Sequence, residues 1–412
     1  MKFTFDSCFV RSPSFPFRFS FAQYWASSAI LLILVTWPLW WPASEIGQSG
    51  IGQYPSLPWF SMLESSSLFV WLRVLTVGCL VCLFAGATEK ISPRRCWVGV
   101  VICLAFSFLL DQHRLQPWAY QTAIYGVIFA SCNRIWERRL LTVLIVSIYF
   151  YSALGKFDFQ FAHTVGQDFL SQLLSPVAGS LPAIDPAVAT KLALIFPSIE
   201  IIAAIGLLLA PCRSAAAWIL IGMHATLILM LGPWAADHST GVLAWNAILI
   251  GQAYFMFIRS PDSETDPPPL AVRPKPMVAM IVVGLAVLAP IGERWGYWDH
   301  WLSWSLYSPH TSRTSIQLHA SCLNRLPAGL REHVLEDRDG DRWHRVSIEN
   351  WSLTSRRVPV YPQARYQLQL ARWIATAAAI DREIRVTHSS VSDRWTGVRI
   401  QRQLLGKRNL WD

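Results

Sequence analysis

Charged residues are scarce in this chain: only 15% of its 412 residues are Asp, Glu, Lys or Arg, whereas 53% are hydrophobic. A soluble globular domain carries about 25% charged residues. The composition therefore excludes an ordinary soluble protein and predicts one that is mostly embedded in a lipid bilayer. The 21 tryptophans and 21 phenylalanines agree with this prediction, because aromatic side chains are enriched where membrane helices meet the headgroups.

Sequence motifs of catalysis and nucleotide binding are also missing. The chain has no GxSxG, HExxH, P-loop or GxGxxG pattern, so nothing supports a hydrolase or a nucleotide-binding protein. The stretch from Asp337 to Asp341 reads DRDGD, but it fails the register of an EF-hand and predicts a hairpin turn. Asp237 and His238 are adjacent and cannot form a metal site alone. We therefore predict no metal site.

The cysteines do not provide a disulfide framework. Seven of the eight lie in or beside apolar segments, and only Cys322 lies in the polar C-terminal part. Cys79 and Cys82 form a CxxC pair inside a predicted helix. We interpret them as buried thiols that pack like small apolar groups, with a redox pair as the alternative.

Long apolar runs predict the architecture. Nine segments, of about 15 to 22 residues each, are long enough to span a bilayer when tilt is allowed. They are Ala22–Trp41, Ser67–Ala87, Cys96–Leu110, Trp118–Cys132, Leu140–Gly155, Ala189–Ala210, Ser214–Gly232, Gly241–Ile258 and Met277–Ile291. We therefore predict a mainly α-helical, polytopic transmembrane bundle of about nine spans.

The distribution of basic residues predicts the orientation of this bundle. Arginines concentrate in alternate loops, at Arg94, Arg138 and Arg213 among others, and basic loops remain cytoplasmic. This places the N-terminus in the cytoplasm and the C-terminal part outside it. The predicted units are an eight-span bundle (1–258), a proline-rich cytoplasmic linker (259–276), a ninth span with a tryptophan-rich interfacial collar (277–312) and an extracytoplasmic domain (313–412).

The C-terminal domain has the pattern of a small β-rich, α+β fold. Alternating residues predict strands at Ser315–Ala320, Trp343–Glu349, Arg356–Val360, Glu383–Thr387 and Val398–Leu404, and a helix at Tyr366–Ile380. From residue 313 onward there are 17 Lys and Arg against 10 Asp and Glu. This positive excess suits anionic lipid or a protein partner. We expect no nucleic acid, because no binding motif accompanies the charge.

Polar residues at the ends of the odd-numbered spans converge on the outer face. Lys156 and Asp158 follow the fifth span, where charges are costly unless they are used or paired. A lysine that snorkels among aromatic anchors is the alternative interpretation. The other polar residues predicted to reach this face are Asp111, His113, Arg114, Gln116, His163, Asp237, His238, Asp299 and His300.

Three further polar residues lie within predicted spans. Glu200 and His224 fall about 15 Å from opposite faces at 1.5 Å per residue, hence near the midplane. We expect them to pair or to share a water, because a lone charge there is costly. Asn246 lies close to the outer end of the eighth span. Such residues serve either as a polar clamp between helices or as a path for protons or substrate.

Several of these segments together resemble the vitamin K-dependent gamma-carboxylase superfamily and its horizontally transferred transmembrane (HTTM) domain. The resemblance rests on the order and spacing of motifs in Phe108–Tyr125, Ile148–Leu170 and Ile199–Gly232. The smaller DoxX/MauE-like redox-associated membrane proteins share a Gly-x-Lys and Glu pattern and remain a rival.

The resemblance implies that Lys156 is a base that acts on a reduced quinone, with Asp158 and His113 beside it. Trp118 stands where the family's catalytic histidine falls, so we do not expect glutamate carboxylation unless His113 replaces that histidine. Two other functions stay open. One is a non-catalytic membrane scaffold, and the other is a DoxX/MauE-like redox component in which Cys79 and Cys82 take part.

Overall fold

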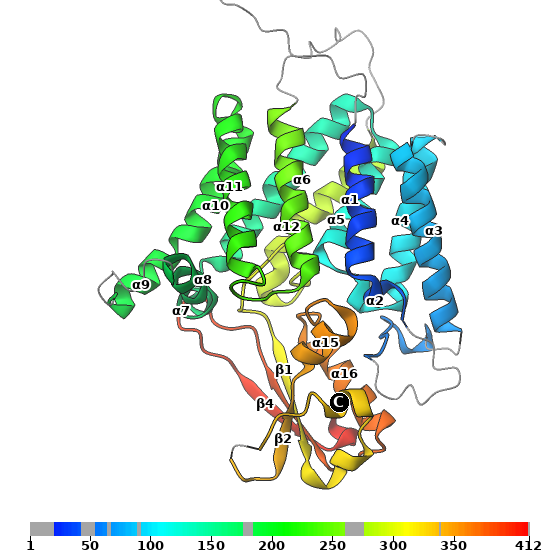
Figure 1. Cartoon of the computed structure of the whole chain (residues 1–412), viewed down its shortest axis with the longest axis vertical. Coiled ribbons are helices and arrows are strands. Elements are labelled where there is room, and N and C mark those ends of the chain that lie inside the picture. The colour runs from blue at the N-terminus through cyan, green and yellow to red at the C-terminus, as the bar shows by residue number, and fades with distance from the viewer. Residues whose placement is uncertain are drawn as a thin grey trace, which may run out of the picture.

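The chain folds into a helical bundle with a small sheet-containing domain at one end (Figure 1). The computed structural model describes residues 20–42, 54–63, 67–88, 92–175, 184–259, 276–337 and 339–410. Most of the predicted proline-rich linker lies outside these described residues.

Helices occupy all nine segments that were predicted to span the bilayer. Within the described residues, seven helical stretches are long and apolar enough to cross a membrane: Leu68–Thr88, Pro93–Leu110, Arg134–Lys156, Pro186–Leu208, Ala210–Leu231, Thr240–Ile258 and Met277–Trp295. The other two, α1 (Phe21–Val35) and α5 (Pro117–Ser131), have 15 residues each. The prediction of a multi-span helical membrane protein is confirmed.

The seven stretches correspond to named helices. They are, in chain order, α3 (Leu68–Thr88), α4 (Pro93–Leu110), α6 (Arg134–Lys156), α9 (Pro186–Ala193) with α10 (Ile195–Leu208), α11 (Arg213–Leu231), α12 (Thr240–Ala253) and α13 (Met277–Leu288). Two short helices, α7 (Phe159–His163) and α8 (Val165–Leu174), connect α6 to α9.

The outer surface of the bundle is apolar. On α3, Val70, Val74, Val77 and Val81 are each about half exposed and repeat every three or four residues, so they share one helix face. A soluble protein would place polar side chains on such a face. We conclude that this face meets lipid.

Local signals in the sequence set the ends of α6, which carries Lys156. Asn133 caps the N-terminus, where its side-chain oxygen accepts hydrogen bonds from the backbone of Ile135 and Trp136. The helix ends at Lys156, and Asp158 then caps the next helix, α7, by accepting from the backbone of Gln160. The chain therefore turns immediately after Lys156.

The C-terminal domain contains a four-stranded antiparallel sheet in the order β2-β1-β3-β4. Its strands are β1 (Arg313–His319), β2 (Trp343–Val346), β3 (Ile384–Ser389) and β4 (Gln401–Leu405), and its longer helices are α15 (Ile348–Arg356) and α16 (Ala364–Ala377). Four of the predicted strands and the predicted helix are confirmed. The strand predicted at Arg356–Val360 is wrong: Arg356 ends α15 and the residues after it form an irregular loop.

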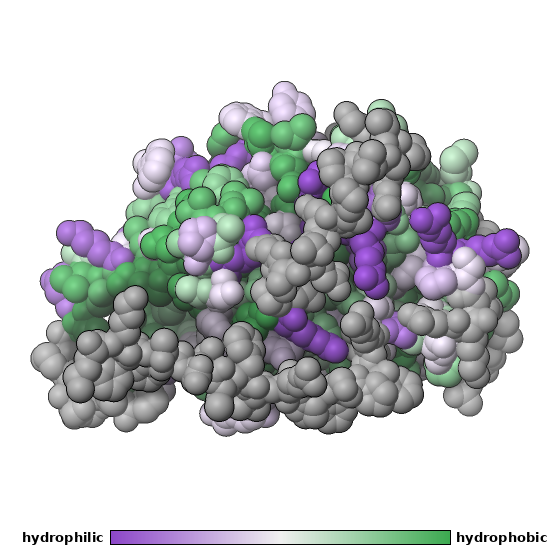
Figure 2. All heavy atoms as spheres, turned by 90° about the horizontal axis from the view of Figure 1, so that it is seen from above, coloured by the Kyte–Doolittle hydropathy of each residue, from purple (hydrophilic) through white to green (hydrophobic). Residues whose placement is uncertain are grey.

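The domain contacts the bundle at the end where α4 and α6 finish. Asp111, directly after α4, forms an ion pair with Arg356, and Arg394 donates a hydrogen bond to the carbonyl of Phe157, directly after α6. Both helices begin beside basic residues, which therefore lie at the opposite end of the bundle. Figure 2 looks onto that end and shows hydrophilic residues among the apolar ones.

Candidate functional site

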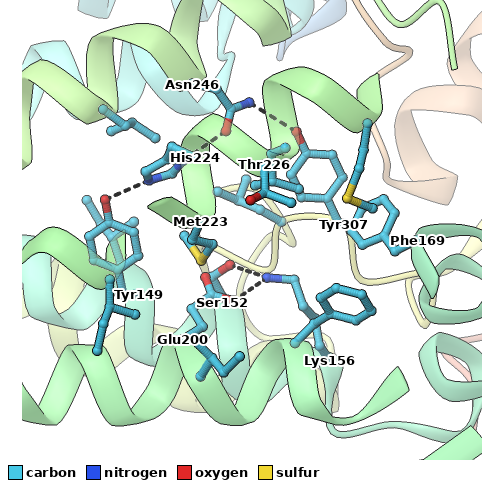
Figure 3. A pocket seen from close by; sticks show the side chains of 18 of the residues that line it. Tyr149, Ser152, Lys156, Phe169, Glu200, Met223, His224, Thr226, Asn246 and Tyr307 are labelled. Carbon is cyan, nitrogen blue, oxygen red and sulfur yellow. Dashed lines mark hydrogen bonds and ion pairs between the residues drawn. The ribbon is translucent and has the colours of Figure 1, made fainter. Parts of the chain in front are cut away.

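A cavity of about 310 Å³ lies inside the bundle beside Lys156 (Figure 3). We call it the Lys156 cavity. Its walls come from α6, α8, α10, α11 and α12 and from the segment 300–310 that follows α13. Apolar and aromatic side chains dominate the lining, among them Phe169, Phe196 and Trp245. Its volume is at the lower end of the range of small-molecule sites, which is about 300–1,000 Å³.

Lys156 forms a buried ion pair inside this cavity. Its Nζ lies 2.5 Å from Oε2 of Glu200 on α10 and also donates a hydrogen bond of 2.7 Å to Oγ of Ser152. The two charged side chains are only 8% and 6% exposed. Lys156 therefore points into the bundle and does not snorkel to the surface.

A chain of hydrogen bonds follows on the other side of the cavity. Tyr149 Oη lies 2.8 Å from Nε2 of His224, and the other ring nitrogen, Nδ1, lies 2.9 Å from Oδ1 of Asn246. Asn246 in turn donates to the hydroxyl of Tyr307 at 3.4 Å. Because Oδ1 of an amide can only accept, Nδ1 carries the proton and Nε2 of a neutral His224 accepts from Tyr149. Figure 3 shows the Lys156–Glu200 pair and the hydrogen-bonded chain through His224 facing the same space.

The structure brings together four of the predicted site residues: Lys156, Glu200, His224 and Asn246. One expected contact differs. Glu200 takes Lys156 as its partner, while His224 bonds to Tyr149 and Asn246. All four nevertheless line one cavity.

The rim of the Lys156 cavity includes side chains that face the bilayer. Leu173, Ile199 and Ile219 line the cavity and are 46%, 42% and 41% exposed. Leu173 comes from α8. Ile199 on α10 and Ile219 on α11 lie among other exposed apolar residues of their helices, such as Ile195, Ile202 and Trp218. This part of the cavity rim therefore belongs to the apolar outer surface of the bundle.

The predicted residues of the 111–116 loop lie elsewhere, beneath the C-terminal domain. Asp111 is fully buried and pairs with Arg356 at 3.1 Å. Arg114 donates to the carbonyls of Trp40 and Leu72 and stacks on the ring of Trp40. The Asp111–Arg356 pair joins the bundle to the domain, whereas the contacts of Arg114 lie within the bundle. Neither residue lines the Lys156 cavity.

His113 shares this buried position. Its Nε2 lies 2.9 Å from the carbonyl of Pro359, and its ring packs between Tyr54 and Tyr366. Burial, helped by the charge of Arg356, lowers the pKa of His113 to about 4. His113 is thus a neutral packing residue at neutral pH.

Three further predicted residues also lie outside the lining of the Lys156 cavity. Asp158 pairs with Arg294 at 2.7 Å. Asp237 is exposed in a turn with φ +46°. His238 lines a second cavity, of about 210 Å³, between the bundle and the C-terminal domain. Trp245, Leu306 and Tyr307 line both cavities and separate them.

Three residues that form hydrogen bonds with the predicted site residues were not themselves predicted from the sequence. Tyr149 and Ser152 precede Lys156 by seven and four residues, which is the spacing of one helix face. That spacing could have identified both. Tyr307 lies in the irregular segment before β1, where φ is +57°, and no local pattern directs it to the cavity.

Comparison of the chain with protein-family models, with curated proteins and with solved structures finds no match. The site therefore has to be interpreted from its own geometry.

Proposed function

We propose that this integral membrane protein binds a lipid of the quinol type in the Lys156 cavity, with the polar ring at the buried ion pair and the apolar chain toward the bilayer. The supporting observation is one apolar, lipid-facing cavity that encloses the Lys156–Glu200 pair. A water-soluble substrate has no comparable need for an entrance among Ile199, Ile219 and Leu173.

The polar groups suit a ring that carries two oxygens. The ammonium of Lys156 donates, the carboxylate of Glu200 accepts, and the hydroxyl of Tyr307 does both. A quinol hydroxyl that gives its proton to the carboxylate of Glu200 leaves a phenolate, which the ammonium of Lys156 stabilises. The Lys156–Glu200 pair would then act as the proton-exchanging group, and the His224 chain would orient the ring.

The resemblance to the HTTM class points to the same lysine and the same ligand class. Glutamate carboxylation is not part of the proposal. Trp118, at the position of the family's catalytic histidine, is buried and packs against Trp40 at a ring distance of 5.5 Å. His113 does not replace that histidine, because it is held beneath the C-terminal domain by Pro359. A DoxX/MauE-like thiol function has less support, since Cys79 and Cys82 lie on α3 and outside the lining of the cavity.

We also place the C-terminal domain outside the cytoplasm, together with the ends of α4 and α6 that it contacts. The arginines at the opposite end of the bundle support this orientation, because basic loops remain cytoplasmic. The domain then covers the outer end of the bundle.

Photolabelling of the full chain in nanodiscs tests the binding site. The probe is an azido-quinone with a short isoprenoid chain, and labelled residues are identified by mass spectrometry. We expect labels on α10 and α11, around Ile199 and Met223. The variant Met223→Trp fills the cavity and should reduce labelling about ten-fold or more, as expected for a loss of about 1.4 kcal/mol or more.

The matched control is Leu229→Trp on the same helix. Leu229 is 62% exposed and is not among the residues that line the cavity. We expect labelling in this variant to equal that of the natural chain. Equal loss in both variants, or labels spread over the lipid-facing surfaces of α3 and α13, would reject the quinol site and favour a non-catalytic scaffold.

A further inference from the structure

Two histidines and a glutamate meet where the last transmembrane helix joins the C-terminal domain. Glu293 lies in the 3-10 turn Ala289–Trp295 that extends α13. Its Oε1 is 2.9 Å from Nδ1 of His300 and 2.9 Å from Nε2 of His310, and its Oε2 is 3.0 Å from the same atom of His310. All three residues are buried, with at most 7% of their surface exposed.

The two histidines bracket the segment that closes the Lys156 cavity. Leu306 and Tyr307, which lie between them, line that cavity. Trp304 in the same segment is fully buried and stacks on Tyr120 at a ring distance of 4.9 Å. Both ends of this irregular segment are therefore attached to one carboxylate at the end of α13.

Two residues of this segment have a strained backbone. Trp304 and Tyr307 have φ of +58° and +57°, values that large side chains rarely adopt. Such a residue persists only where the surroundings hold it. Whatever joins His300 to His310 must supply part of that restraint.

The donor set is that of a transition-metal site. One ligand atom from each residue lies within 4.8 Å of the others, and within the described parts of the chain no other three His, Cys, Asp or Glu residues meet this way. Two imidazoles and one carboxylate are typical ligands of Zn²⁺ and of other divalent ions late in the first transition row. Ca²⁺ and Mg²⁺ prefer oxygen ligands alone.

We propose that Glu293, His300 and His310 bind a divalent transition-metal ion such as Zn²⁺, which fastens the segment 300–310 over the Lys156 cavity. The ion replaces the hydrogen bonds to Glu293: each of the two ring nitrogens gives its lone pair to the metal, and the proton it carried moves to the other nitrogen of the same neutral ring. A fourth position remains for water. The proposal does not depend on the quinol, because metal binding is measured without it.

Zinc binding to the full chain in detergent tests the site. The protein is purified without a histidine tag, stripped with a chelator and titrated with Zn²⁺ by calorimetry, and its metal content is measured by mass spectrometry. We expect one Zn²⁺ for each chain and a rise in the unfolding temperature when Zn²⁺ is added. Stripped protein reloaded with Co²⁺ should show the visible absorption of a low-symmetry nitrogen and oxygen site.

Variants assign the ion to these residues. Glu293→Gln and His310→Gln should each weaken Zn²⁺ binding at least ten-fold, while His163→Gln, an exposed histidine outside the cluster, should leave it unchanged. If the natural chain binds no Zn²⁺ with an affinity above that of surface histidines, the proposal is rejected and the cluster is a hydrogen-bonded clamp. That result stands even if a variant fails to fold, because it needs the natural chain alone. Equal binding in all three variants also rejects it.

Discussion

Lys156 and Glu200 are 44 residues apart in the chain and meet at 2.5 Å in the interior of the bundle. The contact ties the end of α6 to the middle of α10 at the wall of the cavity. Because both charges are removed from solvent, each depends on the other. This mutual dependence gives the first prediction.

Removal of one member of this pair should cost far more than removal of both. Lys156→Met or Glu200→Met leaves a buried, uncompensated charge, and each should lower the free energy of unfolding by about 3–5 kcal/mol. The double variant carries no charge there and should recover most of that loss. Denaturant unfolding of the full chain in detergent measures all three.

Arg325 and Glu383 provide the comparison pair. They also meet at 2.5 Å, but their side chains are 40% and 30% exposed. Replacement of either by Met should cost no more than about 1 kcal/mol. Equal losses at the two pairs would contradict the burial argument.

Arg356 should anchor the C-terminal domain to the bundle. Its guanidinium pairs with Asp111 and also donates to the carbonyl of Tyr54. Arg356→Gln leaves the buried carboxylate of Asp111 without its cation, so a loss of about 3 kcal/mol or more is expected. Limited proteolysis should then cut between bundle and domain at least ten times faster. Arg357→Gln, at an exposed neighbouring position, should change neither stability nor the rate of cleavage.

Much of this molecule could be predicted from its sequence because hydrophobic length and period are local properties. Helices occupy all nine apolar runs, and Glu200 and His224, which a rise of 1.5 Å per residue places at similar depths, line the same cavity. The sequence did not predict that Glu200 pairs with Lys156. Sequence fixes how deep a residue lies along its helix, whereas the rotation of α6 against α10 depends on packing with other helices.

The residues around His113 show a second limit. Asp111, His113 and Arg114 follow a span and are polar, so the sequence placed them on an open outer face. The structure buries them: Arg356, 245 residues farther along, docks on Asp111, and bundle residues such as Trp40 and Leu72 enclose Arg114. The same docking explains the wrong strand at Arg356–Val360: alternating residues there satisfy contacts with the bundle, and tertiary packing overrides β-propensity.

His113 should make stability depend on pH. Its pKa in the folded chain is about 4, lowered by burial, and a histidine in the unfolded chain titrates near 6.5. Between these values the unfolded chain binds the extra proton, so stability falls as the pH falls from about 6.5 to 4. The full effect is about 3 kcal/mol at 1.36 kcal/mol for each pKa unit.

The variant His113→Gln isolates this contribution from those of other histidines. Glutamine can still donate to the carbonyl of Pro359 but does not titrate. The unfolding temperature of the variant should therefore fall less steeply between pH 6.5 and 4 than that of the natural chain. Parallel pH profiles for the two proteins would show that His113 is protonated in the folded state.

Close contact between α10 and α11 should be sensitive to a single methyl group. A Cβ added at Gly206 on α10 would lie 2.9 Å from Cβ of Ala216 on α11, and small residues commonly allow membrane helices to approach. Gly206→Ala must move the two helices apart, so we expect a loss of about 1–3 kcal/mol. The same movement widens the wall that holds Glu200 and Met223, and azido-quinone labelling should fall with it.

Gly222→Ala on α11 is the matched control, because a Cβ there meets nothing within 4 Å. Alanine has a higher helix propensity than glycine, so this variant should leave the free energy of unfolding unchanged or raise it by up to about 1 kcal/mol. Equal destabilisation by both variants would mean that helix packing at Gly206 does not shape the cavity.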